Sequence, residues 1–131
     1  MMESIDTNIN QNKLLNYQQL QTWRKDNEFI INGYRITSNS HALSWFSIFE
    51  WHNQSVNIWS HLIPALILFF CAFYYIFLSI ANYANNKENK MVRLNLVMAF
   101  FYLSSTLMFF GSASFHTEQN NNEITFNIFA A

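Results

Sequence analysis

The sequence predicts an all-α membrane protein with two transmembrane helices in its 131 residues. Hydrophobic residues make up 51% of the chain and charged residues only 11%, whereas a typical soluble domain has about 25% charged residues. No Asp, Glu, Lys or Arg occurs from 51 to 86 or from 94 to 117. A chain this short has no soluble core large enough to bury both apolar runs, so a bilayer is the environment that suits them.

The composition also excludes several classes of function. The formal net charge is −1, so we expect no nucleic-acid partner. The single cysteine, Cys71, lies within an apolar run, which excludes a disulfide framework and a thiolate metal cluster. Two glycines and one proline leave little room for a glycine-rich phosphate loop.

The first part of the chain is more polar. Residues 1–22 lack the apolar stretch of a secretory signal, and we expect them to form a disordered tail. Residues 23–61 form an entry region in which the apolar side chains of 41–59 follow one helical stripe. We expect an amphipathic helix over 41–59 that lies in the membrane interface and is capped by Ser40. The alternative is a direct extension of the first span, but the polar side chains between 50 and 57 suit hydrocarbon poorly.

Two segments match the about 20 residues that cross about 30 Å of hydrocarbon. Residues 62–81 are the first predicted transmembrane helix, with Pro64 in its first turn, where a missing N–H costs little. Residues 94–116 are the second, and the polar residues 82–93 form the loop between them.

Ser105, Ser112 and His116 share one face of the second predicted helix. In lipid, such a polar face turns toward other helices or a wet cavity. Two interpretations stay open at this point. Small and hydroxyl residues allow close helix packing, and alternatively His116 is one ligand of a metal with Ser112 beside it. One histidine does not make a zinc site, which needs three or four ligands.

The other histidines look less functional. His52 and His61 are nine residues apart and would face opposite sides of one continuous helix. One helix therefore cannot aim both at one metal. Because His61 adjoins the start of the first span, we expect it to be an interfacial anchor. His41 begins the interfacial segment, and we expect it to be a solvated residue at a helix start. The asparagine runs at 85–86 and 120–122 look like compositional bias in loops.

Five segments, in this order and spacing, resemble the progestin and adipoQ receptor family, which includes the adiponectin receptors, hemolysin III-type proteins and fungal zinc-homeostasis relatives. They are Asp26-Asn27, Gly33–Arg35, Ser47–Phe49 leading to His52-Asn53, Asn57–His61, and Ser112–Thr117. The asparagine-rich loops favour the fungal branch. The chain departs from the family pattern at Gln54, at Pro64 and in the segment 118–123.

The resemblance implies a seven-helix bundle of which this chain is the N-terminal portion. Residues 117–131 would then be a loop and the truncated start of a third helix. In the family, one zinc ion is held by one histidine of the second span and two of the seventh, accompanied by a serine and an aspartate. His116 matches the first ligand and Ser112 the serine, and the remaining ligands are absent from this chain. We therefore expect zinc only in the complete protein.

The resemblance also implies a function. We expect a multi-pass membrane receptor-like protein, or a zinc-dependent hydrolase of ceramide-type lipid amides involved in lipid and zinc homeostasis, with this fragment inactive by itself. The alternative is a non-catalytic two-span module that assembles with other transmembrane helices. The expected partners are membrane lipid, a ceramide-type substrate and other spans. The family topology places the N-terminus in the cytoplasm, in the endoplasmic reticulum or plasma membrane, although the charges of 82–93 slightly favour the opposite orientation.

Overall fold

The structure, a computed structural model, describes residues 14–85 and 88–130. The chain divides into two compact units. We call Met1–Ser55 with Thr117–Ala131 the entry unit, and Val56–His116 the hairpin unit. The elements in chain order are β1 (Leu15–Asn16), η1 (Tyr17–Gln19), η2 (Thr22–Arg24), β2 (Asn32–Tyr34), α1 (His41–Phe46), η3 (Ser47–Phe49), α2 (Ser55–Ala84), α3 (Asn89–Glu118) and α4 (Glu123–Ala130).

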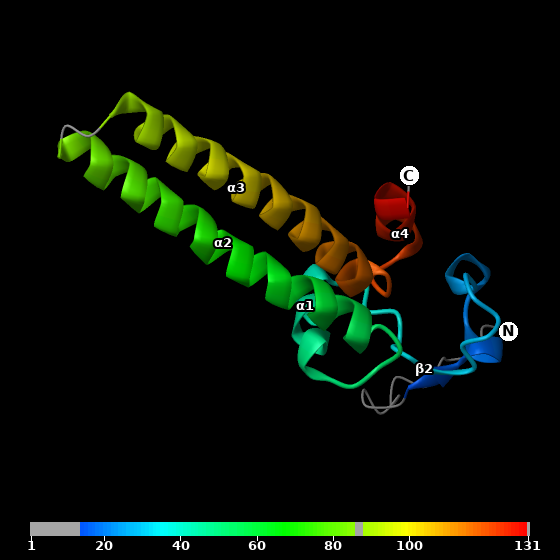
Figure 1. The fold of residues 1–131 in the computed structure, drawn as a ribbon. Helices are drawn as coiled ribbons and strands as arrows, with labels where there is room; N and C mark the ends of the chain where they lie inside the picture. Colours follow the sequence, from blue (N-terminus) through cyan, green and yellow to red (C-terminus); the bar gives the residue numbers. More distant parts are fainter. Residues whose placement is uncertain (1–13, 86–87, 131) are drawn as a thin grey trace, which may run out of the picture. The chain divides into compact units, whose positions relative to one another are not determined.

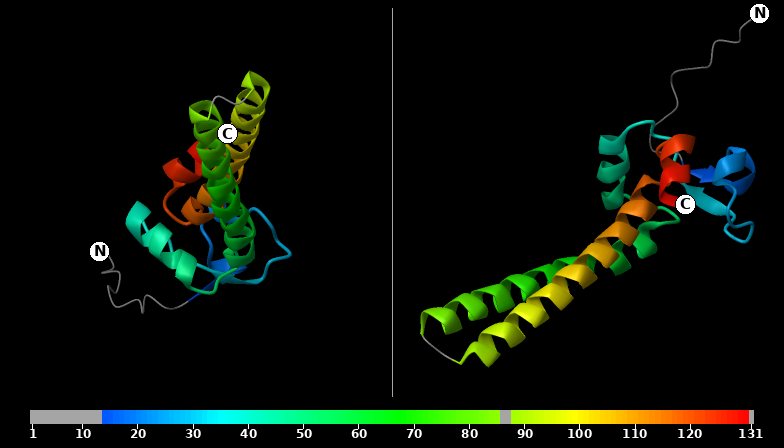
Figure 2. Two further views of the ribbon diagram at one scale, coloured as in Figure 1. Left: turned by 60° about the vertical axis from the view of Figure 1, so that its left-hand side comes forward. Right: turned by 90° about the horizontal axis from the view of Figure 1, so that it is seen from above.

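Two long helices form the hairpin unit, and they run antiparallel and side by side (Figures 1 and 2). Each of α2 and α3 has 30 residues, or about 45 Å at 1.5 Å per residue. Both are long and apolar enough to cross a membrane. The prediction of an all-α membrane protein with two transmembrane helices is confirmed, and the helices extend beyond the predicted runs because their polar flanks also adopt helical structure.

The hairpin is held together by small residues at seven-residue intervals. This spacing keeps one stripe of each helix facing its partner, and small side chains let the two backbones approach closely. The buried residues of these stripes are Ala65, Ala72 and Ser79 on α2 and Ala99, Thr106 and Ala113 on α3. Two contacts across the hairpin agree with this register: the Ser79 hydroxyl donates to the carbonyl of Val92 at 3.3 Å, and the rings of Tyr75 and Tyr102 stack at 5.5 Å.

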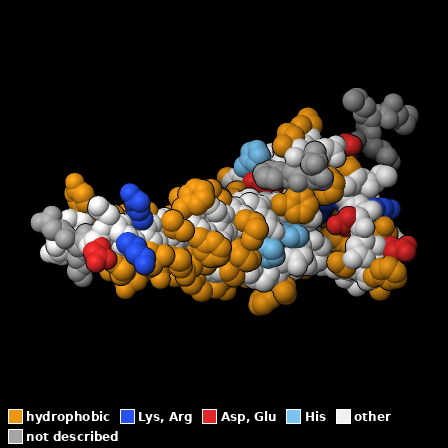
Figure 3. Space-filling view, turned by 45° about the horizontal axis from the view of Figure 1, so that its top comes forward, with side chains coloured by type: hydrophobic (Ala, Val, Ile, Leu, Met, Phe, Trp, Pro, Cys, Tyr) orange, Lys and Arg blue, Asp and Glu red, His pale blue; other side chains and the backbone are white. Residues whose placement is uncertain are grey.

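The outer surface of the hairpin is apolar. Phe70, Phe77 and Phe100 are among its many exposed large side chains, and hydrophobic atoms cover much of the face drawn in Figure 3. A soluble protein rarely exposes so continuous an apolar surface, whereas a membrane span requires it.

The entry unit contains order that the sequence did not predict. Residues 1–13 of the expected disordered tail lie outside the described residues, but 14–22 are structured. Leu15 of β1 pairs antiparallel with Tyr34 of β2, and Asn16 and Gln19 cap η1 reciprocally. Strands of two and three residues show no sequence period, so hydrophobic patterning could not reveal them.

The expected interfacial helix over 41–59 is wrong as one continuous element. Ser40 does cap α1, where its hydroxyl accepts from the N–H of Leu43. The helical path ends after η3, and residues 50–54 are non-helical before α2 begins. The Ser55 hydroxyl stabilises this break, because it accepts from the N–H of His52 at 2.9 Å and donates to the carbonyl of Glu50 at 3.0 Å.

Helix α2 therefore includes residues that we had assigned to the interfacial stripe, Val56 and Trp59. Its earlier start also places Pro64 inside the helix instead of in the first turn. A proline at that position removes one backbone hydrogen bond from the ladder.

Candidate functional site

The register of the hairpin places His61 of α2 beside His116 of α3. Their ring centroids are 5.9 Å apart at an interplanar angle of 65°, and Phe109 contacts the same His61 ring at 5.7 Å. Phe109 and His116 follow Tyr102 at seven-residue intervals, and His61 lies 14 residues before Tyr75. The two histidines therefore belong to the same contact row as the stacked tyrosines. We call His61 and His116 the histidine pair.

This placement adds a contact with α3 that the expectation of an interfacial anchor at His61 did not include. The His61 side chain is half-buried in the hairpin. Its Nδ1 atom is buried and has no hydrogen-bond partner among the residues that the structure describes. Buried ring nitrogens are usually hydrogen-bonded, and an unsatisfied one costs about 1–3 kcal/mol. A buried nitrogen without a partner in the described part of the chain, on a ring that contacts His116, is the reason to include His61 in the candidate site.

The predicted polar face of α3 has two kinds of hydroxyl. Ser105 donates to the carbonyl of Phe101 at 2.9 Å, so its hydroxyl is satisfied within its own helix. Ser112 lies one turn before His116 on the same side of α3 and is half-buried. The expectation that His116 turns toward another helix agrees with the structure, because its ring contacts α2.

The histidine pair has side chains of a kind that bind zinc, but two histidines are too few to form a complete zinc site. Neutral imidazole nitrogen is a common zinc ligand, and zinc sites take three or four protein ligands. No group of three or more His, Cys, Asp or Glu side chains that could hold a metal occurs within residues 14–85 and 88–130. Any further ligands would have to come from outside this part of the chain.

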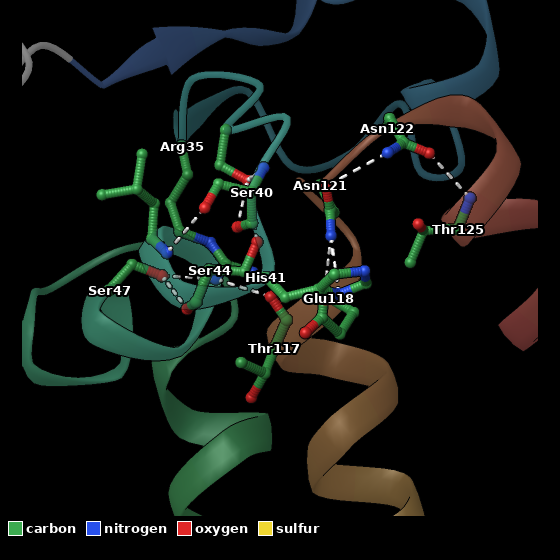
Figure 4. Close-up of polar contacts among 12 residues, drawn as sticks. Arg35, Ser40, His41, Ser44, Ser47, Thr117, Glu118, Asn121, Asn122 and Thr125 are labelled. Atoms are coloured by element: carbon green, nitrogen blue, oxygen red, sulfur yellow. Dashed lines mark hydrogen bonds and ion pairs between the residues drawn. The ribbon is translucent and has the colours of Figure 1, made fainter.

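A buried arginine organises the entry unit (Figure 4). Arg35 is only 5% exposed, and its Nη1 donates to the Ser47 hydroxyl at 2.7 Å and to the carbonyl of Thr117 at 3.0 Å. Burial, together with the charge of Arg24, lowers the pKa of Arg35 to about 9, and the carboxylate of Glu118 acts in the opposite direction. Arg35 thus joins two segments 82 residues apart.

The asparagine run at 120–122 lies in a loop, as expected, and its side chains make structural hydrogen bonds there that the composition did not indicate. Asn121 is 1% exposed, and its amide donates to Oε2 of Glu118 at 2.8 Å. The same carboxylate oxygen lies 3.0 Å from Nδ1 of His41, whose ring is otherwise largely exposed. Further contacts join the N–H groups of Ser38 and Asn39 to the carbonyls of Asn120 and Asn121, and the N–H of Thr125 in α4 to the side chain of Asn122.

His52 is a structural residue of the entry unit. It lies before α2, so the continuous helix assumed in comparing it with His61 does not exist. Burial and the charge of Arg35 lower the pKa of His52 to about 4. Its Nδ1 accepts from the N–H of Gln54 at 3.1 Å, so the neutral ring carries its proton on Nε2.

The entry unit also has a small polar pocket of about 20 Å³. That volume is close to what one water molecule needs, and it is too small for a lipid headgroup. The lining residues are Arg24, Asp26, Tyr34, Arg35, Asn53, Gln54, Gln119 and Phe126.

Comparison with known proteins assigns the family. The sequence model of the haemolysin-III related family matches residues 49–131, a range that includes α2, α3, the histidine pair and Ser112. The chain belongs to the haemolysin-III related family. The resemblance to the progestin and adipoQ receptor group that we drew from the sequence motifs is thereby confirmed.

Three relatives illustrate this membership of the haemolysin-III related family. The chain is 44% identical over 57 residues to the ADIPOR-like receptor IZH2 of Saccharomyces cerevisiae, covering 44% of this chain and 18% of the relative. It is 32% identical over 105 residues to the progestin and adipoQ receptor-like protein 1 of Caenorhabditis elegans, covering 80% and 23%. It is 42% identical over 60 residues to the heptahelical transmembrane protein 1 of Arabidopsis thaliana, covering 46% and 17%.

The haemolysin-III related chain spans less than a quarter of the length of each of these three relatives.

The sequence contained one signal that would have found His61. Small residues recur every seven positions in both apolar runs. His61 lies four residues before Ala65 of the first row, and His116 lies three residues after Ala113 of the second. Arg35 stood in a recognised segment, but only the structure gives it a role.

Proposed function

We propose that this haemolysin-III related chain provides the entry region and first two spans of a multi-pass, receptor-like membrane protein that binds zinc through His116. One observation carries the proposal: the His116 ring lies inside the hairpin against His61, with Ser112 one turn earlier on the same helix. A histidine that packs against another span instead of lipid is typical of functional sites in membranes. The remaining ligands would come from spans outside this chain.

The reaction that suits this arrangement is hydrolysis of a lipid amide of the ceramide type. Bound zinc would supply Lewis-acid polarisation of the amide carbonyl and a bound water with a pKa of about 7. His116 would hold the metal, and the Ser112 hydroxyl would offer a hydrogen bond beside it. The apolar outer faces of α2 and α3 suit the acyl chains of such a substrate.

We also infer a location for the complete protein. The family topology supports a cytoplasmic N-terminus, in the endoplasmic reticulum or the plasma membrane. A role in lipid and zinc homeostasis follows from the proposed substrate and metal. Cysteine labelling at residues 41–49 from the cytoplasmic side only would support this orientation, and labelling from the opposite side would contradict it.

The alternative is a non-catalytic module that assembles with other transmembrane helices. The hydrogen bonds of the α3 hydroxyl groups support this alternative. The hydroxyls of Ser105, Thr106 and Ser114 donate to carbonyls of their own helix. Hydroxyl and small residues satisfied in this way are typical of close helix packing.

Metal analysis distinguishes the two functions. We suggest a chimaera in which this chain replaces the matching segment of the ADIPOR-like receptor IZH2. The zinc-site proposal expects about one zinc per chain, lost in His116→Ala and kept in the matched control His41→Ala. Zinc retained without His116 would refute the site. Zinc bound at His116 without release of fatty acid from ceramide would favour a receptor over a hydrolase.

A further inference from the structure

We propose that His61 is a positioning residue that holds the imidazole ring of His116 in one orientation. This inference rests on the proposed function of His116 and adds a residue of α2 to its site. A metal ligand needs a fixed ring as well as a suitable nitrogen, and the residues around ligating histidines usually provide that constraint.

The contacts around the His116 ring support a packing mechanism. His61 of α2 approaches it at 5.9 Å and 65°, and Phe115 of α3 approaches it at 5.1 Å and 62°. Both separations lie within the about 4.5–7 Å range, and both angles near the edge-to-face geometry, in which aromatic rings attract. His116 is therefore contacted by one ring from each helix.

His61 is itself fixed by the hairpin. Its ring contacts that of Phe109 at 5.7 Å, and Phe109 lies seven residues before His116 in the same contact row of α3. Its Nδ1 makes no hydrogen bond within the described part of the chain, so no bond at that atom ties the side chain to another element. The ring contacts with Phe109 and His116 are therefore the interactions of His61 that bear on the proposed role.

The register of α2 and α3 makes the contact between residues 61 and 116 depend on the size of the side chain at 61. Ala65 and Ala113 are small residues buried near this end of the hairpin, and such residues permit close helix packing. A large side chain at 61 can then reach the ring at 116, whereas an alanine at 61 leaves a gap beside it. The aromatic ring is the required feature, so phenylalanine at 61 should replace histidine in this role.

The first test measures ring order in the 131-residue chain, without metal. In lipid nanodiscs with isotope-labelled histidine, we expect one rigid orientation of the His116 ring in the unmodified chain. His61→Ala should give an averaged, mobile ring, and His61→Phe should keep it ordered. The matched control, His41→Ala, lies in the entry unit and should change nothing.

A second readout separates positioning from general destabilisation. The Tyr75–Tyr102 stacking contact should persist in His61→Ala if only the His116 ring is released. An ordered His116 ring in His61→Ala would overturn the proposal. Loss of the tyrosine contact in the same variant would also overturn it, since His61 would then simply stabilise the hairpin.

Zinc affinity in the IZH2 chimaera provides the final measurement. Removing a residue that orients a metal ligand typically lowers affinity about 10–100-fold, so we expect that loss in His61→Ala and recovery in His61→Phe. A Phe variant as weak as the Ala variant would refute positioning by ring packing. If His116→Ala leaves zinc unchanged, the proposed zinc function fails, whereas the ring-order result still decides the role of His61.

Discussion

Replacing Arg35 with lysine should destabilise the entry unit more than replacing it with methionine. Arg35 donates two charge-assisted hydrogen bonds, to Ser47 and Thr117, which together contribute about 3–6 kcal/mol. Its burial opposes this. Burial, together with the charge of Arg24, lowers the pKa of Arg35 from 12.5 to about 9 and so disfavours its charged form.

The variants differ in what they leave behind. Methionine removes the buried charge and takes the Arg35 donor away from the carbonyl of Thr117. The Ser47 hydroxyl also loses Arg35 but still donates to the carbonyl of Ser44 at 2.7 Å. We expect a loss of about 1–3 kcal/mol. Lysine keeps a buried charge, but its shorter side chain does not place the more strongly hydrated ammonium where Nη1 of Arg35 meets both acceptors. Its expected loss is therefore about 3–5 kcal/mol.

Amide hydrogen exchange at Ser38 and Asn39 measures these losses. Their N–H groups donate to Asn120 and Asn121 across the same junction, at 2.8 and 2.9 Å. Because about 1.4 kcal/mol is a factor of ten, Arg35→Met should accelerate exchange about 5–150-fold and Arg35→Lys still more. Faster exchange in the methionine variant than in the lysine variant would refute this reasoning.

Three further predictions concern other parts of the chain. Gly33→Ala should destabilise the entry unit by about 1–3 kcal/mol, because Gly33 has φ of 90°, and unchanged thermal stability would contradict this. Ala72→Leu should weaken hairpin packing by about 1–3 kcal/mol because Ala72 is buried between the spans, whereas Phe73→Leu at an exposed site should not, as measured by interhelical distances in nanodiscs. His52 should titrate near pH 4 by NMR. Its folded-state pKa lies below the unfolded value, so the entry unit should lose stability as pH falls from about 6.5 toward 4. Exchange of the Gln54 amide should become faster over the same range. A titration midpoint of His52 near 6.5 would contradict the burial argument.

The sequence motifs predicted the candidate site only in part. His116 and Ser112 came from a family resemblance and a shared helix face, and the structure places both at the end of α3 that carries the histidine pair. The spacing of His52 and His61 carries no information about facing, because the helix is interrupted at 50–54. The antiparallel register of two helices, and not the spacing along one, brings His61 to His116.

Sequence alone determined the two spans, because an uninterrupted apolar run must find hydrocarbon whatever its neighbours are. It also located the cap at Ser40, since capping depends on a few adjacent residues. Tertiary structure alone decided which polar residues are buried together. Arg35 meets Thr117, and Asn39 meets Asn121, across about 80 residues of chain. A hydrogen bond between distant segments leaves no period in either one, so those contacts follow only from how the entry unit folds.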